Sequence, residues 1–288
     1  SYRVATDYKQ IIDLNTDPAT RAQMSAYGPN NNQIAAARTM LAYTFLNLVD
    51  TFGAIPYWSY GNKDADFQAL QINSELQPKF ASQAKVYADI LKELKEASEM
   101  IEPGVVFTSG DRLFGSGAKL KKFANSLRLR VATRVKGVVP GAEAHITDAI
   151  ASGVMTSNAD TVGLAFEANL TNPSPMYNDF RTRSDLAISK TFVQLLKGEK
   201  GNFGLDPRLF KYATPKGVTK ALILAGTSPE STNPADFNGM PYGVSSQAAP
   251  SQTSSSNFFS KNVYKMDYSE VYMEYAEVQF LLSEANGW

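Results

Sequence analysis

The sequence contains no cysteine and only one histidine among its 288 residues. The lack of cysteine excludes disulfides, thiol nucleophiles, Cys-ligated zinc, iron–sulfur clusters and lipid attachment to cysteine within these residues. Any Ser-His-Asp triad would have to use His145, which lies in an ordinary helical stretch, and no Gly-x-Ser-x-Gly motif accompanies it. We therefore expect no nucleophilic hydrolase.

An excess of charge of one sign is also missing, because 28 Lys and Arg residues balance 28 Asp and Glu residues. A neutral chain has no general attraction to phosphate backbones, so nucleic-acid binding is not expected. The sequence has no Gly-Lys-Ser or Gly-Lys-Thr phosphate loop and no dinucleotide-binding glycine motif. No apolar run reaches about 18 residues, so no membrane-spanning helix is predicted, and residues 1–7 do not resemble a signal peptide.

Metal and acid–base sites have little support. Asp13, Asn15 and Asp17 match the first ligand positions of an EF-hand loop, but Pro18 and Met24 stand where glycine and a bidentate glutamate are required. We therefore predict no metal-ligating residue and no cofactor, and leave open only an irregular structural calcium site. The carboxylate pair of a glycosidase has no sequence signature here, so we predict a protein that is not an enzyme and has no catalytic residue.

The main positive feature of the sequence is apolar residues at helical spacing, and 43% of all residues are hydrophobic. Steps of three and four residues predict long helices over 33–49, 86–101 and 118–136, and shorter ones over 8–14, 142–152 and 189–197. Residues 50–61 form an aromatic-rich loop, and 226–262 a long surface loop rich in Gly, Pro, Ser, Thr and Asn. A final helix over 269–285 is apolar on two sides, which is typical of a helix packed between neighbours.

This layout predicts a mainly α fold built from tetratricopeptide-like helix pairs, followed by a mixed part that contains the long late loop. No two copies of the repeat of about 34 residues can be aligned, so the helix pairs rest on layout alone. We expect one domain over 1–288, with helix pairs in 1–137, a mixed loop-rich part in 138–268 and a returning helix in 269–288.

Basic residues are concentrated between Arg112 and Ala142, a segment with eight of them and no acid. A polyanion site is one interpretation. On a helical projection, however, Arg130 and Arg134 lie at the edge of the apolar arc, where they need partners. The final helix offers such partners in Glu270, Glu274 and Glu277, so we favour internal ion pairs.

Aromatic residues make up 11% of the chain, and several lie in predicted loops. A sugar ring stacks its apolar face on an exposed aromatic ring, while neighbouring polar side chains bond its hydroxyl groups. The alternative is that these rings fill gaps between helices. The candidate ligand-binding residues are Trp58, Tyr60, Tyr177 and Tyr242.

Five segments resemble, in order and spacing, landmarks of the SusD/RagB-like outer-membrane lipoproteins of Bacteroidota. The segment 47–57, NLVDTFGAIPY, resembles the family stretch lvDtyGdiPY. The segment 121–130, KKFANSLRLR, resembles a family helix in which tryptophan usually stands at the position of Lys121. The other three segments are 181–190, 206–209 and 277–285.

The resemblance implies a mainly α fold of tetratricopeptide-like helix pairs with an irregular, loop-rich subdomain. It implies a non-catalytic protein that binds glycans or related nutrients. It also implies partnership with a TonB-dependent, SusC-like transporter and a lipid-anchored place on the extracellular face of the outer membrane. Family members are longer, so we expect the chain to be an internal part of one, with membrane contact only through an N-terminal lipid anchor outside these residues. No family binding residue falls within the matched segments. The alternative function is a helical-repeat scaffold that binds a protein or peptide.

Overall fold

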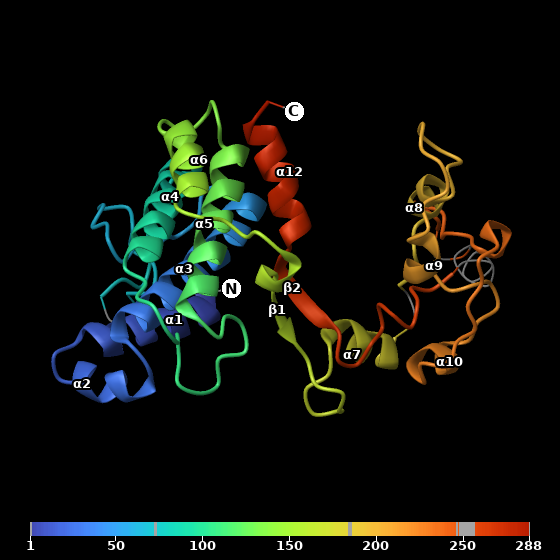
Figure 1. Ribbon diagram of the computed structural model, residues 1–288, viewed down its shortest axis with the longest axis horizontal. Coiled ribbons are helices and arrows are strands. Elements are labelled where there is room, and N and C mark those ends of the chain that lie inside the picture. Colours follow the sequence, from blue (N-terminus) through green and yellow to red (C-terminus); the bar gives the residue numbers. More distant parts are fainter. Residues whose placement is uncertain (1, 72–73, 184–185, 246, 248–256, 288) are drawn as a thin grey trace. The chain divides into compact units, whose positions relative to one another are not determined.

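The computed structural model describes residues 2–71, 74–183, 186–245, 247 and 257–287 (Figure 1). The chain forms two compact units. Unit 1 comprises Ser1–Gly163 together with Val271–Trp288, and unit 2 comprises Leu164–Glu270. Each unit has its own apolar core.

Unit 1 is a stack of helices. The longest elements are α3, α4 and α5, and α1 and α6 cover the two ends of the stack (Figure 1). Each of these helices packs on the next, so α1 contacts α3, α3 contacts α4, α4 contacts α5 and α5 contacts α6. The expectation of a mainly α fold is confirmed. The bounds in unit 1 are α1 Tyr2–Thr16, α2 Arg21–Met24, η1 Ser25–Tyr27, α3 Asn30–Phe52, α4 Gln83–Glu99, α5 Gly117–Arg134, α6 Ala142–Ala151 and η2 Asn158–Asp160.

Local sequence explains these helices and their ends. The serine side chains at 82 and 116 accept hydrogen bonds from the backbone N–H groups of the third residue of α4 and of α5, which caps both helices. Three successive alanines of α3, Ala35, Ala36 and Ala37, are buried and allow its neighbours to approach closely. α3 continues to Phe52, so the predicted loop begins three residues later than expected, at Gly53, whose φ of 76° ends the helix.

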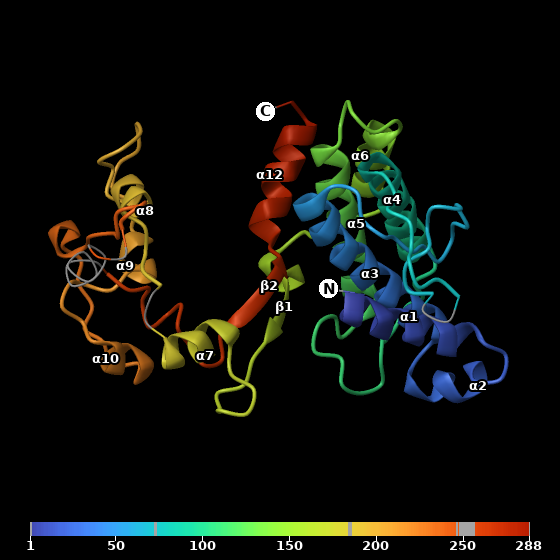
Figure 2. The same cartoon turned by 180° about the vertical axis from the view of Figure 1, so that it is seen from behind.

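The segment from Ser269 to Ala285 differs from the prediction. Residues Ser269–Met273 form strand β2, which pairs with β1 (Val162–Ala165), and helix α12 covers only Tyr275–Ala285. The helix predicted over 269–285 is therefore wrong over its first six residues, because a distant strand is available as a partner. Figure 2 shows α12 beside α5.

Ion pairs join the basic helix to the rest of unit 1. Arg130 on α5 binds Glu277 on α12 through two hydrogen bonds of 2.5 and 2.6 Å, which confirms the expected internal pairing. Arg134 instead pairs with Asp50 at the end of α3. Asp50 also accepts a hydrogen bond of 2.5 Å from Tyr87 on α4, so a single carboxylate ties three helices together. Burial and this bond raise the pKa of Tyr87 to about 12.

The division into units departs from the predicted parts. α6 and the residues up to 163 belong with the helix stack, whereas the prediction placed residues 138–268 in the loop-rich part. The reason is packing: α6 buries Ile146 and Ala149 against α5. Single-sequence periodicity marks a helix but does not show which neighbour it covers.

Unit 2 consists of short helices joined by long connections. Ser189 caps α8 by accepting a hydrogen bond from the N–H of Phe192, as its sequence position predicts. The stretch 226–262 contains one 3₁₀ turn among its described residues, and 246 and 248–256 lie outside them. The elements are α7 Pro175–Thr182, α8 Lys190–Leu196, α9 Leu209–Tyr212, α10 Lys220–Leu224 and η3 Pro234–Asp236.

No described helix combines the length and apolar character needed to cross a membrane.

Asp160 fixes the turn that follows α6. Its carboxylate accepts hydrogen bonds from the N–H and hydroxyl of Thr156, at 2.8 and 3.1 Å, and binds the ammonium of Lys122 on α5 at 2.9 Å. The side chain is 13% exposed. Burial alone would raise the pKa of Asp160, but these donors lower it to about 2.

Acid should therefore weaken unit 1 through Asp160. Because an unperturbed Asp has a pKa of about 3.9, this contribution is complete above about pH 4 and is lost as pH falls toward about 2. We expect Asp160→Asn to lower the free energy of unfolding at neutral pH by about 2 kcal/mol and to flatten its decline in that window. Urea unfolding at several pH values measures both effects. Glu143→Gln, exposed on α6, should retain the wild-type slope, and a wild-type slope in Asp160→Asn would contradict the assignment.

Candidate functional site

The loop between α3 and α4 is held on α4 by two buried carboxylates. Asp89 accepts hydrogen bonds from the Tyr57 hydroxyl at 3.0 Å and from the Asn62 amide at 2.8 Å. Burial raises the pKa of Asp89, and burial together with the neighbouring Asp89 carboxylate raises the pKa of Tyr57. Glu93, one turn further along α4, accepts from the Ser59 hydroxyl at 3.0 Å and the Gly61 N–H at 2.8 Å. The loop therefore has a fixed conformation over residues 57–62.

A buried ion pair supports the same loop from beneath. Arg38 on α3, 4% exposed, binds Glu93 at 2.9 Å and Glu96 at 2.6 Å. Burial alone would lower the pKa of Arg38, but these two carboxylates raise it. The guanidinium carbon lies 4.8 Å from the ring centre of Tyr60, so this ring covers the ion pair.

Aromatic packing fixes the other side of the loop. Phe45 on α3 contacts Tyr57 edge to face, with ring centres 4.7 Å apart, and Tyr57 contacts Phe67 in the same way at 4.8 Å. The N–H of Ala69 donates to the carbonyl of Tyr57 at 3.0 Å. This bond holds the backbone just before Leu70 against the backbone just before Trp58.

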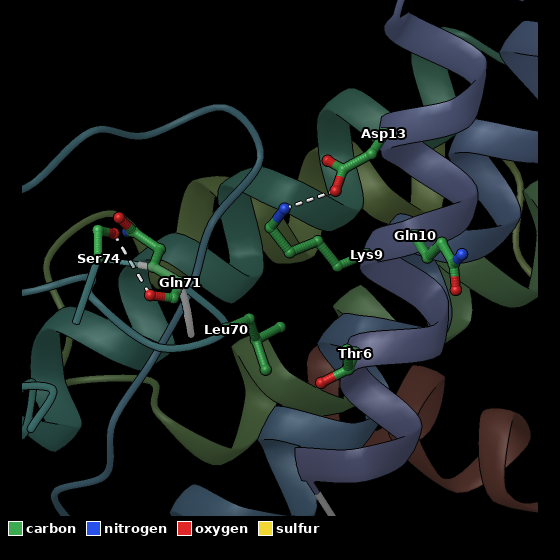
Figure 3. A pocket seen from close by; sticks show the side chains of 7 residues that line it. All are labelled: Thr6, Lys9, Gln10, Asp13, Leu70, Gln71 and Ser74. Carbon is green, nitrogen blue, oxygen red and sulfur yellow. Dashed lines mark hydrogen bonds and ion pairs between the residues drawn. The ribbon is translucent and has the colours of Figure 1, made fainter. Parts of the chain in front are cut away.

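A hollow of about 570 Å³ lies between α1 and this loop (Figure 3). In the figure, Lys9 and Asp13 lie on the α1 side, Gln71 and Ser74 on the loop side, and Leu70 between them. Leu70 has a φ of 61°, and within the described residues it is the one non-glycine with a positive φ. Such strained backbone is often found at ligand sites. The lining residues are Thr6, Lys9, Gln10, Asp13, Leu70, Gln71 and Ser74.

The lining suits a neutral ligand rich in hydroxyl groups. Lys9 and Asp13 form an ion pair at 2.6 Å, so their charges cancel. The hydroxyl and amide groups of the other polar residues can each donate and accept hydrogen bonds. The Lys9 ammonium lies 5.4 Å from the ring centre of Trp58, which places this half-buried indole next to the hollow. The site thus combines polar groups with an aromatic ring.

The four aromatic residues predicted from sequence have different environments. Trp58 lies beside the hollow, whereas the ring of Tyr60 is engaged with Arg38. Tyr177 and Tyr242 belong to unit 2. The expectation that Tyr177 stands on a loop is wrong, because Pro175 begins helix α7 and the Tyr177 side chain is only 8% exposed on it. Tyr242 is 98% exposed.

Sequence analysis missed the contribution of α1 to this hollow. Thr6, Lys9, Gln10 and Asp13 recur at steps of three and four residues, so they share a polar face of the helix. This pattern was visible, but a polar helix face usually meets only solvent. Among the residues that the structure describes, no three His, Asp or Glu side chains gather in a way that could hold a metal ion.

Solved structures share this fold across both units. The chain aligns with a structure named as a chitin-binding protein at a TM-score of 0.73 and 23% identity, covering 98% of this chain and 56% of that one. An outer membrane protein of Bacteroides vulgatus, whose name connects it with nutrient binding, aligns at a TM-score of 0.71 and 25% identity. The alignment covers 98% of this chain and 59% of that one. A SusD homolog of Bacteroides fragilis aligns at a TM-score of 0.72 and 23% identity, covering 98% of this chain and 58% of that one. The chain thus spans less than two thirds of the length of these structures.

The likeness in fold agrees with a match to a sequence family. The sequence model of the SusD-like family, described as starch-binding and associating with the outer membrane, matches residues 2–288. The chain belongs to this SusD-like family, whose members are binding proteins and not enzymes. No curated protein matches the sequence.

Proposed function

We propose that this chain is part of a nutrient-binding protein of the outer membrane and that it binds an oligosaccharide in the hollow between α1 and the α3–α4 loop. The observation that carries the proposal is the charge-balanced, polar lining of about 570 Å³ next to the indole of Trp58. The volume lies within the range of about 300–1,000 Å³ typical of small-molecule sites. Membership of a family described as starch-binding supports a saccharide as the ligand.

In this proposal the scaffold is built before the ligand arrives. Asp89 and Glu93 fix the loop through four hydrogen bonds, so the loop loses little conformational entropy when a sugar binds. Gln71 and Ser74 would bond hydroxyl groups from the loop side, and Thr6 and Gln10 from α1. Trp58 would contribute apolar contact at the rim. No bond is made or broken, which is consistent with a family of binding proteins.

We further propose that the complete protein is lipid-anchored on the extracellular face of the outer membrane and delivers its ligand to a TonB-dependent, SusC-like transporter. The family description, which states association with the outer membrane, supports this placement. Co-purification of such a transporter with the complete protein from membranes is the corresponding measurement. Capture of a peptide without any response to glycans would support the scaffold alternative instead.

Substitutions in the hollow test the proposed ligand class. We expect Trp58→Ala and Gln71→Ala each to weaken retention in an amylopectin affinity gel, or binding of chitin oligosaccharides by calorimetry, by about tenfold, the equivalent of 1.4 kcal/mol. Tyr27→Ala removes an exposed ring of unit 1 that does not line the hollow, so it should bind like wild type.

Thermal unfolding separates loss of binding from loss of structure. Gln71 is exposed, and its replacement should leave the midpoint of unfolding unchanged. If Trp58→Ala unfolds, its ring belongs to the core and Gln71→Ala decides the question. Wild-type binding by a folded Gln71→Ala protein together with wild-type binding by Trp58→Ala would overturn the site.

A further inference from the structure

Unit 2 contains a second polar hollow, of about 210 Å³, between α8 and the segment 237–241. Its floor is apolar, formed by Val193 and Phe237, both buried. Its walls carry ammonium, carboxylate and amide groups, from Lys190, Gln194, Lys197, Glu199 and Asn238. Every one of these residues lies within unit 2, so this hollow does not depend on unit 1.

The backbone around this hollow is tightly fixed. The N–H of Lys190 donates to the carbonyl of Met240 at 2.8 Å, and the N–H of Met240 donates to the carbonyl of Ile188 at 2.7 Å. Gly239 lies so close to α8 that a Cβ placed on it would be 2.3 Å from the Cα of Lys190. The segment is therefore pressed against the start of α8, and only glycine permits this approach. A wall held in this way can keep its polar groups in position before a ligand binds.

The charges in the second hollow do not cancel. Lys197 and Glu199 form an ion pair at 2.9 Å, which neutralises both. Within the described part of the chain, Lys190 has no acidic partner. The net charge of the lining is thus positive by one unit, in contrast to the balanced Lys9–Asp13 pair of unit 1. A ligand that carries one negative charge would neutralise the lining.

We infer that this hollow binds a single sugar unit that carries a carboxylate, that is, a uronic acid residue of an acidic saccharide. Lys190 would bind the carboxylate, and the amides of Gln194 and Asn238 would bond ring hydroxyls. The volume of about 210 Å³ is below the range of about 300–1,000 Å³ for larger ligands, so the hollow holds one ring of such a saccharide at a time. Tyr242, 98% exposed, follows the lining residue Pro241 in the sequence and would offer an aromatic face to such a ligand.

This inference depends on the proposed function only in taking a saccharide as the ligand class. The two hollows differ in charge and belong to different units, so they predict different specificities.

The test uses the full chain and affinity electrophoresis through gels that contain polygalacturonate or amylopectin, at about physiological ionic strength. We expect wild type to be retarded by polygalacturonate and Lys190→Gln to bind it about tenfold more weakly. Lys200→Gln removes an exposed positive charge that does not line the hollow, and it should behave like wild type. Gln194→Ala should also weaken binding, because it removes a hydrogen-bonding group without changing charge.

The outcomes are distinguishable. Equal losses in Lys190→Gln and Lys200→Gln would show a general attraction to the polyanion and overturn the inference, as would absence of retardation of the wild type. Gln71→Ala in unit 1 should leave retardation by polygalacturonate intact. If amylopectin binding fails while binding of polygalacturonate depends on Lys190, the proposed neutral site falls and the acidic site stands.

Discussion

Replacing Arg38 by methionine should lower the free energy of unfolding of unit 1 by about 3–5 kcal/mol, the usual cost of leaving one charge of a buried pair unpaired. Glu93, which is also buried, would lose its cation while it still holds the Ser59 hydroxyl and the Gly61 N–H. The ring of Tyr60 would lose the guanidinium beneath it. Urea unfolding followed by circular dichroism measures the change.

The matched control for Arg38 is Lys92, which binds the same acceptor residue, Glu96, at 2.8 Å but has a side chain that is 42% exposed. An exposed pair within one helix contributes about 0.3–0.5 kcal/mol, so Lys92→Met should be nearly neutral. If Arg38→Met and Lys92→Met lower the free energy of unfolding by the same small amount, burial of the Arg38 ion pair does not contribute to stability. The ion pair would then not be what supports the α3–α4 loop.

Replacing Phe45 by alanine should have an effect of similar size, because a buried phenylalanine replaced by alanine costs about 3–5 kcal/mol. Phe45 is 1% exposed and contacts Tyr2 of α1 and Tyr57 of the loop, with ring centres at 6.2 and 4.7 Å. These two contacts join the opposite walls of the unit 1 hollow to α3. We therefore expect weaker glycan binding even under conditions in which the variant is fully folded.

Phe52, on the same helix, provides the control because it is 71% exposed. Phe52→Ala should change the free energy of unfolding by no more than about 0.5 kcal/mol. Thermal unfolding measures the stability of each variant, and retention in the amylopectin gel measures its glycan binding. A Phe45→Ala protein that loses stability but keeps wild-type glycan binding would show that the hollow does not depend on this aromatic contact.

The helices could be predicted because each shows its own period in the sequence. The stripe from Val86 to Leu94 and the serine caps at 82 and 116 required no knowledge of neighbours. β2 could not be predicted in this way. Val271, Tyr272 and Met273 fit a helix or a strand equally well, and the choice was made by β1, more than a hundred residues earlier in the sequence.

The candidate site was predictable only in part, for the same reason. Trp58 could be proposed because its loop is recognisable from glycine and proline, and its ring does lie beside a hollow. The engagement of Tyr60 with Arg38 depends on a contact between residues 22 positions apart, on different elements. The polar face of α1 became part of a wall only because Phe45 and Tyr57 bring the loop alongside it. Such pairings depend on tertiary packing, which a single sequence does not reveal.

The division of unit 1 between residues 1–163 and 271–288 has a consequence for how the chain acquires its structure. The hydrogen bonds from Arg130 to Glu277 join residues 147 positions apart. During synthesis, the helices up to α6 emerge well before α12, and unit 2 is completed in between. Contacts of such long separation slow folding, because the entropy of a large loop is lost before they form. Until α12 is synthesised, the α5 surface that it covers is exposed and can associate with other chains. We expect this partly folded state to be the one that aggregates most readily and that a chaperone binds.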